Sequence, residues 1–144
     1  MEAQGPQGPA LSAVYLLDTN ICIYALNRRP TQVLERLVAA GRSRVGVSSI
    51  TAAELAFGAM KSTRAATRPA VEAFLATIPV FEWGGDAVWH YAEVRLALER
   101  AGRRIGERDL LIASQALALG WTVVTNDEGE FSRVPGLRWE NWAQ

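Results

Sequence analysis

Four acidic side chains stand out because apolar residues surround each of them: Asp18, Glu54, Asp109 and Asp127. Carboxylates held close together repel one another, and without a cation some of them take up protons at neutral pH. A hard divalent cation such as Mg²⁺ or Mn²⁺ removes this conflict and prefers oxygen ligands. Such an ion can polarise a phosphoryl oxygen and lower the pKa of a bound water. The four acids therefore indicate metal-assisted hydrolysis, provided that the fold brings them together.

The positions of three acids relative to the predicted strands favour such a meeting. Asp18 follows the apolar run 14–17, and Asp127 follows the predicted strand 121–125. Glu54 lies early in the helix that follows another predicted strand. In a parallel sheet, the carboxyl edge contains the residues that follow each strand and those in the first turn of the next helix. Ligands of open α/β sheets bind at this edge. Asp109 opens a helix that precedes a strand, so its spacing alone does not place it at this edge.

Each acid also has a purely local interpretation. Asp18 and Asp109 are suitable N-caps for the helices that follow them. Glu54 forms a capping-box pattern with Thr51, and Asp127 suits a turn. For Glu54 and Asp109, taken singly, the local role is the better interpretation. The four acids together, on one sheet edge, favour a metal site.

Polar residues next to the acids are candidates for orienting the metal ligands or binding phosphate: Thr19, Asn20, Ser49, Thr125 and Asn126. Arginine suits bidentate contact with phosphate, and 14 of the 15 basic residues are arginines. Arg104 and Arg108 flank the Asp109 region and are the preferred phosphate-binding pair, although solvated surface is the usual role of an arginine. The formal net charge of zero gives no indication of a nucleic-acid binder.

Apolar runs and helical spacing alternate along the chain. Strands are predicted at 14–17, 45–48, 79–83, 121–125 and 137–139. Four helices are predicted at 21–26, 31–40, 49–61 and 68–78, and Thr31 is the cap of the second. A long helix follows residues 84–86 and ends at Gly102. A buried helix extends from Asp109 to Gly120. This alternation predicts an α/β fold: one domain, residues 13–144, with a central parallel sheet of four to five strands flanked by helices.

The remaining features fit a soluble protein of the cytoplasm. Residues 1–12 are rich in Gly, Pro and Gln and are predicted to form a disordered tail. Apolar runs fall short of the roughly 18 residues that a membrane helix needs, so no membrane association is expected. Cys22 is the single cysteine, which rules out an internal disulfide and agrees with a reducing compartment.

Five segments in order resemble one family, the PIN domains, and within it the VapC-type toxin ribonucleases of bacterial type II toxin–antitoxin pairs. They are YLLDTN, SSITAAEL, IGERDLLIASQALALG, TVVTNDEGEF and VPGLRWENW, and the resemblance extends from Val14 to about Trp142. It implies endonucleolytic cleavage of RNA, commonly tRNA or rRNA, at an acidic Mg²⁺ or Mn²⁺ site. It also implies inhibition by a cognate VapB-type antitoxin and, often, a homodimer.

Position by position, the four acids of the family fall on the four acids named above. Thr19 and Asn20 match the residues after the first acid, and Thr125 and Asn126 match the pair before the last. Many relatives carry Asn where this chain has Asp127, so this position is expected to be a weaker or water-mediated ligand.

Three alternatives lie in other classes. A haloacid-dehalogenase-like phosphatase needs a second aspartate two residues after the first, where this chain has Asn20. A receiver-like phospho-acceptor domain needs a lysine near the acids, and Lys61, the only lysine, is predicted within a helix. A non-catalytic PIN domain that only binds RNA or protein is disfavoured by the retention of all four acids.

Overall fold

The computed structural model describes residues 14–144, so the predicted tail at 1–12 lies outside the described residues. The chain alternates short strands with helices, as the sequence predicts. The elements are β1 (Tyr15–Leu17), α1 (Thr19–Asn27), α2 (Thr31–Ala40), the 3-10 turn η2 (Arg42–Arg44), β2 (Val45–Ser48), α3 (Ser49–Lys61), α4 (Thr67–Thr77), β3 (Val80–Phe81), α5 (Ala87–Ala101), α6 (Glu107–Leu119), β4 (Thr122–Val124), α7 (Glu128–Phe131) and β5 (Trp139–Glu140).

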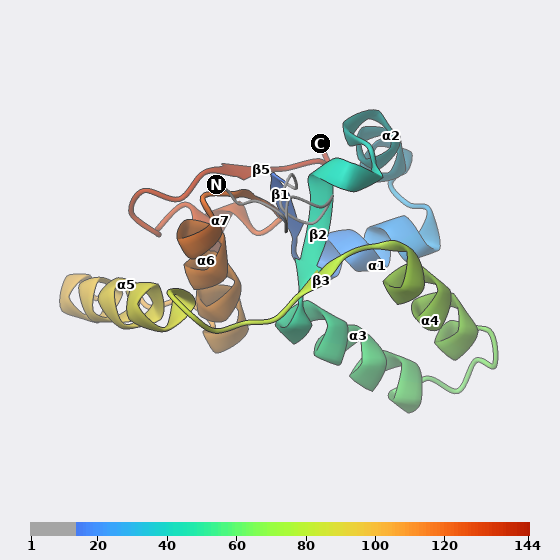
Figure 1. Cartoon of the computed structure of the whole chain (residues 1–144), viewed down its shortest axis with the longest axis horizontal. Helices are drawn as coiled ribbons and strands as arrows, with labels where there is room; N and C mark the ends of the chain where they lie inside the picture. Colours follow the sequence, from blue (N-terminus) through green and yellow to red (C-terminus); the bar gives the residue numbers. More distant parts are fainter. Residues whose placement is uncertain (1–13) are drawn as a thin grey trace, which may run out of the picture.

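The five strands form one parallel sheet in the order β3-β2-β1-β4-β5 (Figure 1). In the register, Leu16 of the central strand β1 lies opposite Gly46 on β2 and Val123 on β4. Because all strands run the same way, the residues that follow β1, β2 and β4 meet at one edge of the sheet. The predicted fold class is confirmed.

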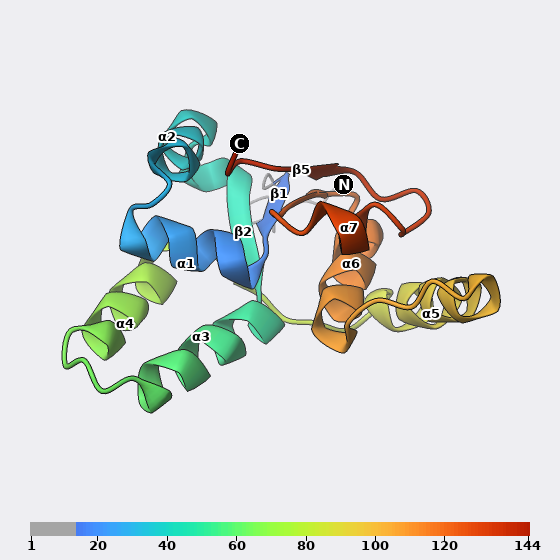
Figure 2. The ribbon, with the colours of Figure 1, turned by 180° about the vertical axis from the view of Figure 1, so that it is seen from behind.

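The side chains of neighbouring residues on a strand point to opposite faces of the sheet, and each face has its own core. Leu17 and Val124 belong to a core formed with helices α1 to α4. Leu16 and Val123 belong to the other core, formed with α5 and α6. Figures 1 and 2 show these two groups of helices on opposite sides of the sheet. The continuous apolar runs of the strands follow from burial on both faces.

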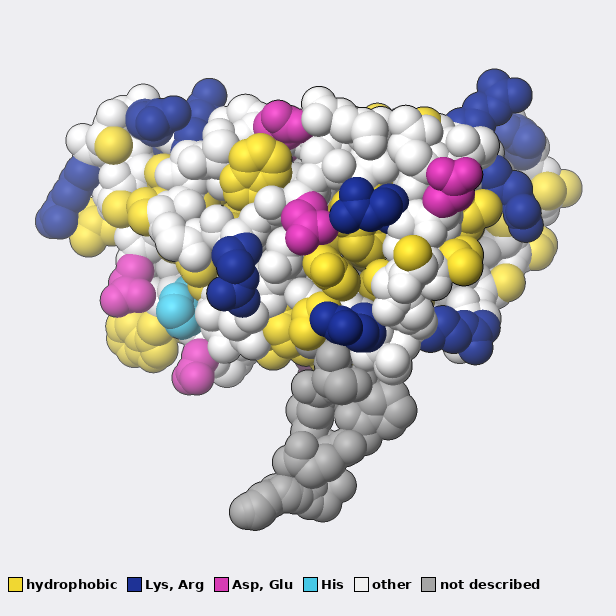
Figure 3. Space-filling model, turned by 90° about the horizontal axis from the view of Figure 1, so that it is seen from above, with side chains coloured by type: hydrophobic (Ala, Val, Ile, Leu, Met, Phe, Trp, Pro, Cys, Tyr) yellow, Lys and Arg dark blue, Asp and Glu magenta, His cyan; other side chains and the backbone are white. Residues whose placement is uncertain are grey.

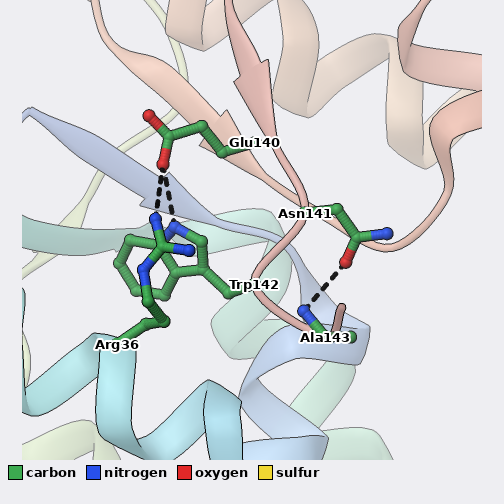
Figure 4. Close-up of polar contacts among 5 residues, drawn as sticks. All are labelled: Arg36, Glu140, Asn141, Trp142 and Ala143. Carbon is green, nitrogen blue, oxygen red and sulfur yellow. Dashed lines mark hydrogen bonds and ion pairs between the residues drawn. The ribbon is translucent and has the colours of Figure 1, made fainter.

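The C-terminal segment joins this framework to α2 (Figure 4). Glu140 Oε1 accepts hydrogen bonds from Arg36 Nη2 at 3.2 Å and from the indole N–H of Trp142 at 2.9 Å. The guanidinium of Arg36 lies 5.3 Å from the centroid of the Trp142 ring, which packs edge-on against Tyr15. Trp142 is fully buried, so the last residues of the chain belong to the core.

Three local predictions differ from the structure. The buried helix α6 begins at Glu107 instead of Asp109, with Gly106 as its N-cap, because acidic residues in the first turn are favoured by the helix dipole. Pro30 rather than Thr31 occupies the N-cap position of α2 and makes no side-chain capping bond. Asp127, which the sequence assigns to a turn, is the N-cap of the short helix α7.

The surface on the side of α2 carries basic side chains that are spread out and interspersed with acidic and apolar ones (Figure 3). This distribution agrees with the formal net charge of zero. None of the helices within residues 14–144 combines the length and the apolar character needed to cross a bilayer.

Candidate active site

Asp18 is buried at the carboxyl end of β1 and is the N-cap of α1. Its Oδ1 accepts the backbone N–H of Ile21 at 2.9 Å, and its Oδ2 accepts the hydroxyl of Thr125 at 2.5 Å. Burial raises the pKa of Asp18 to about 6, although both hydrogen bonds act in the opposite direction. The capping role and a role in a metal site are therefore compatible in one side chain.

Asp109, Asp127 and Glu130 form a second group of acids, whose closest carboxylate oxygens all lie within 4.8 Å of one another. Asp109 comes from the first turn of α6, which begins at the carboxyl edge of the sheet, while the other two come from the start of α7. Burial, the hydrogen bond to Glu130 and the charges of its acidic neighbours, Asp18 among them, together raise the pKa of Asp109 to about 8. The structure thus brings two of the four predicted acids, Asp109 and Asp127, into one group, with Asp18 nearby.

Glu130 belongs to this group although the sequence analysis did not single it out. Its Oε1 accepts the backbone N–H of Gly106 at 3.0 Å, and its own N–H donates to Oδ1 of Asp127 at 3.2 Å. The hydrogen bond from Asp109 lowers the pKa of Glu130, so the two carboxyls titrate as a pair that shares one proton. The spacing Asp127-x-x-Glu130, typical of a capped helix start, is the signal that could have indicated this residue.

The acidic group fits a hard divalent cation. All of its ligand atoms are carboxylate oxygens, which Mg²⁺ and Mn²⁺ prefer over nitrogen or sulfur. In the absence of a cation, burial raises the pKa of both Asp18 and Asp109, and the neighbouring negative charges add to this effect. A divalent cation removes this competition. The residues that would hold it are Asp109, Asp127 and Glu130, with Asp18 beside them.

Glu54 lies in the same cleft but has other partners. Its Oε1 accepts the hydroxyl of Thr19 at 2.5 Å, and its Oε2 pairs with Nε of Arg108 at 2.9 Å. The capping-box interpretation of Glu54 is wrong, because α3 begins at Ser49, with Ser48 as its N-cap, and Thr51 lies inside the helix. Among the described residues, Glu54 is outside the group of acids that converge within 4.8 Å.

A cleft of about 520 Å³ connects these groups. It is lined by Asp18, Thr19, Asn20, Glu54, Gly106, Glu107, Arg108 and Asp109. Thr19 and Asn20 thus lie where the sequence places them. Ser49 does not line the cleft, in contrast to the prediction that it orients metal ligands or binds phosphate. Its hydroxyl accepts the backbone N–H of Trp83 at 3.1 Å instead.

The polar pair after β4 divides between two roles. The hydroxyl of Thr125 donates to Asp18 and accepts the backbone N–H of Asp127 at 2.9 Å, so it links two acids of the site. The Asn126 amide instead donates to the Tyr24 hydroxyl at 2.7 Å and supports α1. Thr125 is therefore an orienting residue, whereas Asn126 contacts the site only indirectly, through α1.

The two predicted arginines also separate. Arg108 lines the acidic cleft, and its side chain is 72% exposed. Arg104 lines a different cavity of about 80 Å³, next to Tyr91 and Arg95, and its backbone carbonyl accepts a hydrogen bond from Arg133. The structure therefore brings one arginine of the pair to the acids.

A parallel sheet whose carboxyl edge gathers carboxylates is the arrangement of a metal-dependent nuclease, and the sequence matches that class of domain. The family description "PIN domain" matches residues 15–137. The chain is 40% identical over 131 residues to Ribonuclease VapC2 of Rickettsia felis, covering 90% of this chain and 98% of that protein. It is 39% identical over 130 residues to the tRNA(fMet)-specific endonuclease VapC of Shigella flexneri, with the same coverage.

Solved structures give the same result. The DNA-bound VapBC of Salmonella typhimurium contains a chain that matches with a TM-score of 0.85 and 37% identity, over 90% of this chain and 98% of that one. VapBC2 of Rickettsia felis, bound to a DNA fragment from its promoter, contains a chain that matches with a TM-score of 0.83 and 38% identity, over 89% and 98% of the two chains. The chain belongs to the PIN-domain family and, within it, to the VapC toxin ribonucleases of toxin–antitoxin systems.

Proposed function

We propose that the chain is an endoribonuclease that requires Mg²⁺ or Mn²⁺ and acts as the toxin of a VapBC-type pair. The observation that carries the proposal is the convergence of Asp109, Asp127 and Glu130 at the carboxyl edge of the sheet, with the buried Asp18 close enough to raise the pKa of Asp109. Family membership supports the nuclease activity, and the all-oxygen donor set supports the choice of cation.

The residues of the site have different tasks. Asp109, Asp127 and Glu130 would hold the cation, with Asp18 fixed beside them by Thr125 and the Ile21 amide. When bound, the cation supplies Lewis-acid chemistry at a phosphoryl oxygen and a lowered pKa for water. Glu54, held by Thr19 and Arg108, stands at the side of the cleft. The metal-ligand role predicted for Glu54 remains a prediction.

The proposed substrate is tRNA. Relatives from Shigella flexneri and Salmonella typhimurium are called tRNA(fMet)-specific endonucleases, and they are 39% identical to this chain. Ribosomal RNA is the alternative that the sequence analysis left open. The exposed guanidinium of Arg108 at the cleft provides a phosphate contact for either RNA.

The proposed partner is a VapB-type antitoxin, because the similar solved structures are VapBC assemblies. A groove of about 400 Å³ runs between α1, α3 and α4 and includes Glu54 of the acidic cleft. Ile23, Leu26 and Leu55 give it an apolar lining. Such a groove suits the apolar face of an amphipathic helix. A homodimer and a cytoplasmic location also remain predictions, and light scattering of the purified chain tests the first of them.

Cleavage of purified tRNA and rRNA by the full chain tests the proposed function. We expect discrete tRNA fragments with Mg²⁺ or Mn²⁺ and none with EDTA. A folded, antitoxin-free protein that cleaves neither RNA with either ion would contradict the proposal and favour the non-catalytic alternative. Cleavage of rRNA alone would keep the nuclease and change its substrate.

A further inference from the structure

A second cavity adjoins the acidic cleft and has a different character. It measures about 510 Å³, and its apolar part is formed by Ile50, Ala53 and Phe57 of α3 and Leu111 of α6. We call these four residues the apolar shelf. Three polar residues line both this cavity and the acidic cleft: Thr19, Glu54 and Arg108. The two cavities therefore adjoin, and their shared border lies between the acidic side chains and the aromatic ring of Phe57.

The aromatic side chain of the shelf is unusually open. Phe57 is 67% exposed, although burying such a ring is worth about 1.5–3 kcal/mol in general. One cation lies over the ring, and a second lines the same cavity. The ammonium of Lys61 lies 5.9 Å from the ring centroid, and the Arg108 guanidinium marks the boundary between the shelf and the acidic cleft. An exposed ring in a cavity that also contains a cation matches the chemistry of a nucleobase and its phosphate.

The ion pair between Arg108 and Glu54 fixes one of these cations in place. Nε of Arg108 lies 2.9 Å from Oε2 of Glu54, whose other oxygen is held by Thr19. Glu54 contacts Nε, and the side chain remains 72% exposed, so the guanidinium can still contact a second group. Arginine binds phosphate bidentately through two N–H groups. Glu54 is thus placed to orient the guanidinium toward a phosphate.

We infer that the apolar shelf and Arg108 form a subsite for one unpaired nucleotide next to the phosphate that is cleaved. The base stacks on Phe57, and its phosphate binds to Arg108, which is positioned by Glu54. The inference rests on the proposed ribonuclease function and adds to it a requirement for single-stranded RNA at this position. Stacking tolerates every base, so the subsite selects unpaired structure more than sequence.

Binding of a short oligoribonucleotide tests the subsite without requiring cleavage. The probe is an unpaired five-nucleotide RNA with 2-aminopurine at its centre, whose fluorescence changes on stacking. It is titrated into the full chain carrying Asp18→Asn with Mg²⁺ and, as a second measurement, into the unsubstituted chain with EDTA. Phe57→Ala is expected to weaken binding about 5- to 150-fold and to abolish the fluorescence change. Phe57→Tyr should retain both, while Phe57→Leu, which keeps the apolar surface but removes the ring, should lose both.

Trp89 provides a matched control, because it is an aromatic residue of α5 that is 73% exposed and lines neither cavity. Trp89→Leu should bind the probe as the parent does. Arg108→Gln should lower the slope of log affinity against log salt by about 0.7, the value for one lost phosphate contact on a single strand. Arg100→Gln, on the exposed last turn of α5, should leave that slope unchanged.

Three results would overturn the subsite. The first is that Phe57→Leu binds the probe as tightly as the parent does. The second is that the parent binds a duplex of the same length as tightly as the unpaired probe. The third is that light scattering shows a loss of self-association in Phe57→Leu. The last would identify the shelf as a contact between copies of the chain. The proposed function fails separately: RNA that stays uncut while probe binding still depends on Phe57 would keep the subsite and remove the nuclease. RNA cleavage together with unchanged probe binding by Phe57→Leu and Arg108→Gln would keep the nuclease and remove the subsite.

Discussion

Asp109 shows how an active site can oppose folding. Its pKa is raised to about 8 in the folded chain, whereas an unfolded aspartate titrates near 4. The folded state therefore holds a proton that the unfolded state releases, and stability falls as the pH rises from about 4 to about 8. A cation that replaces the proton removes this cost.

Asp109→Asn should therefore make the cation-free protein more stable. The new amide donates to Glu130 as the protonated Asp109 does, and it cannot ionise. We expect a higher melting temperature at pH 8 in EDTA, by about 3 °C for each kcal/mol gained in a domain of this size, and a smaller decrease in melting temperature between pH 5 and pH 8. Asp86→Asn, at the exposed start of α5, is the control and should change neither quantity. An equally steep decrease in Asp109→Asn would show that this carboxyl is not the source of the effect.

The same residue predicts how the protein responds to metal. A ligand that binds only the folded state stabilises it by about 2.7 kcal/mol at a concentration 100 times its dissociation constant. Mg²⁺ or Mn²⁺ should therefore raise the melting temperature of the unsubstituted chain by several degrees. The rise should be much smaller in Glu130→Gln, which removes one of the three converging carboxylates. Equal shifts in both proteins would place the cation elsewhere.

At the scale of the elements, the C-terminal segment is predicted to be essential for folding. Trp142 is fully buried between α2 and β1, where it contacts Arg36 and Tyr15. Trp142→Ala should destabilise the chain by about 3–5 kcal/mol, as is usual for a buried tryptophan. Trp89→Ala, at an exposed position, should stay within about 0.5 kcal/mol. Urea denaturation of both variants checks this prediction, and equal midpoints would contradict it.

Most elements could be predicted from the sequence because their signals are local. The apolar run before Asp18 and the glycines after α5 and α6 mark a strand and two helix ends, and all three occur in the structure. The position of Asp109 could not be predicted, because it depends on where α6 begins in space. Its capping interpretation failed because α6 starts two residues earlier, at Glu107.

The candidate site was only partly predictable for a related reason. Glu130 lies 21 residues from Asp109, and they meet only because α7 folds back against the start of α6. The ion pair between Arg108 and Glu54 joins the helices α6 and α3. The hydrophobic periodicity of each helix does not predict how far apart the two helices lie in space. Sequence spacing predicts which residues share a sheet edge, but the contacts between side chains depend on how the helices pack.

For the whole molecule, the groove between α1, α3 and α4 is predicted to bind the antitoxin. Ile23 lines this groove and is 39% exposed, so a charge there should disturb binding more than folding. Ile23→Glu should weaken binding of a co-expressed antitoxin at least 10-fold in calorimetry and leave RNA cleavage intact. Val38→Glu, at an exposed position of α2 outside the groove, is the control. Equal affinity of both variants would move the antitoxin to another surface.

The central claim is that the acids at the carboxyl edge of the sheet cleave RNA. The most direct test compares cleavage of purified tRNA by the unsubstituted chain and by Asp18→Asn, both with Mg²⁺ or Mn²⁺. Asparagine can still accept the Ile21 N–H, so α1 keeps its cap and the variant should give an unchanged circular dichroism spectrum. We predict loss of cleavage by at least about 100-fold in this folded variant. A folded Asp18→Asn protein that cuts tRNA at the parent rate would contradict the account.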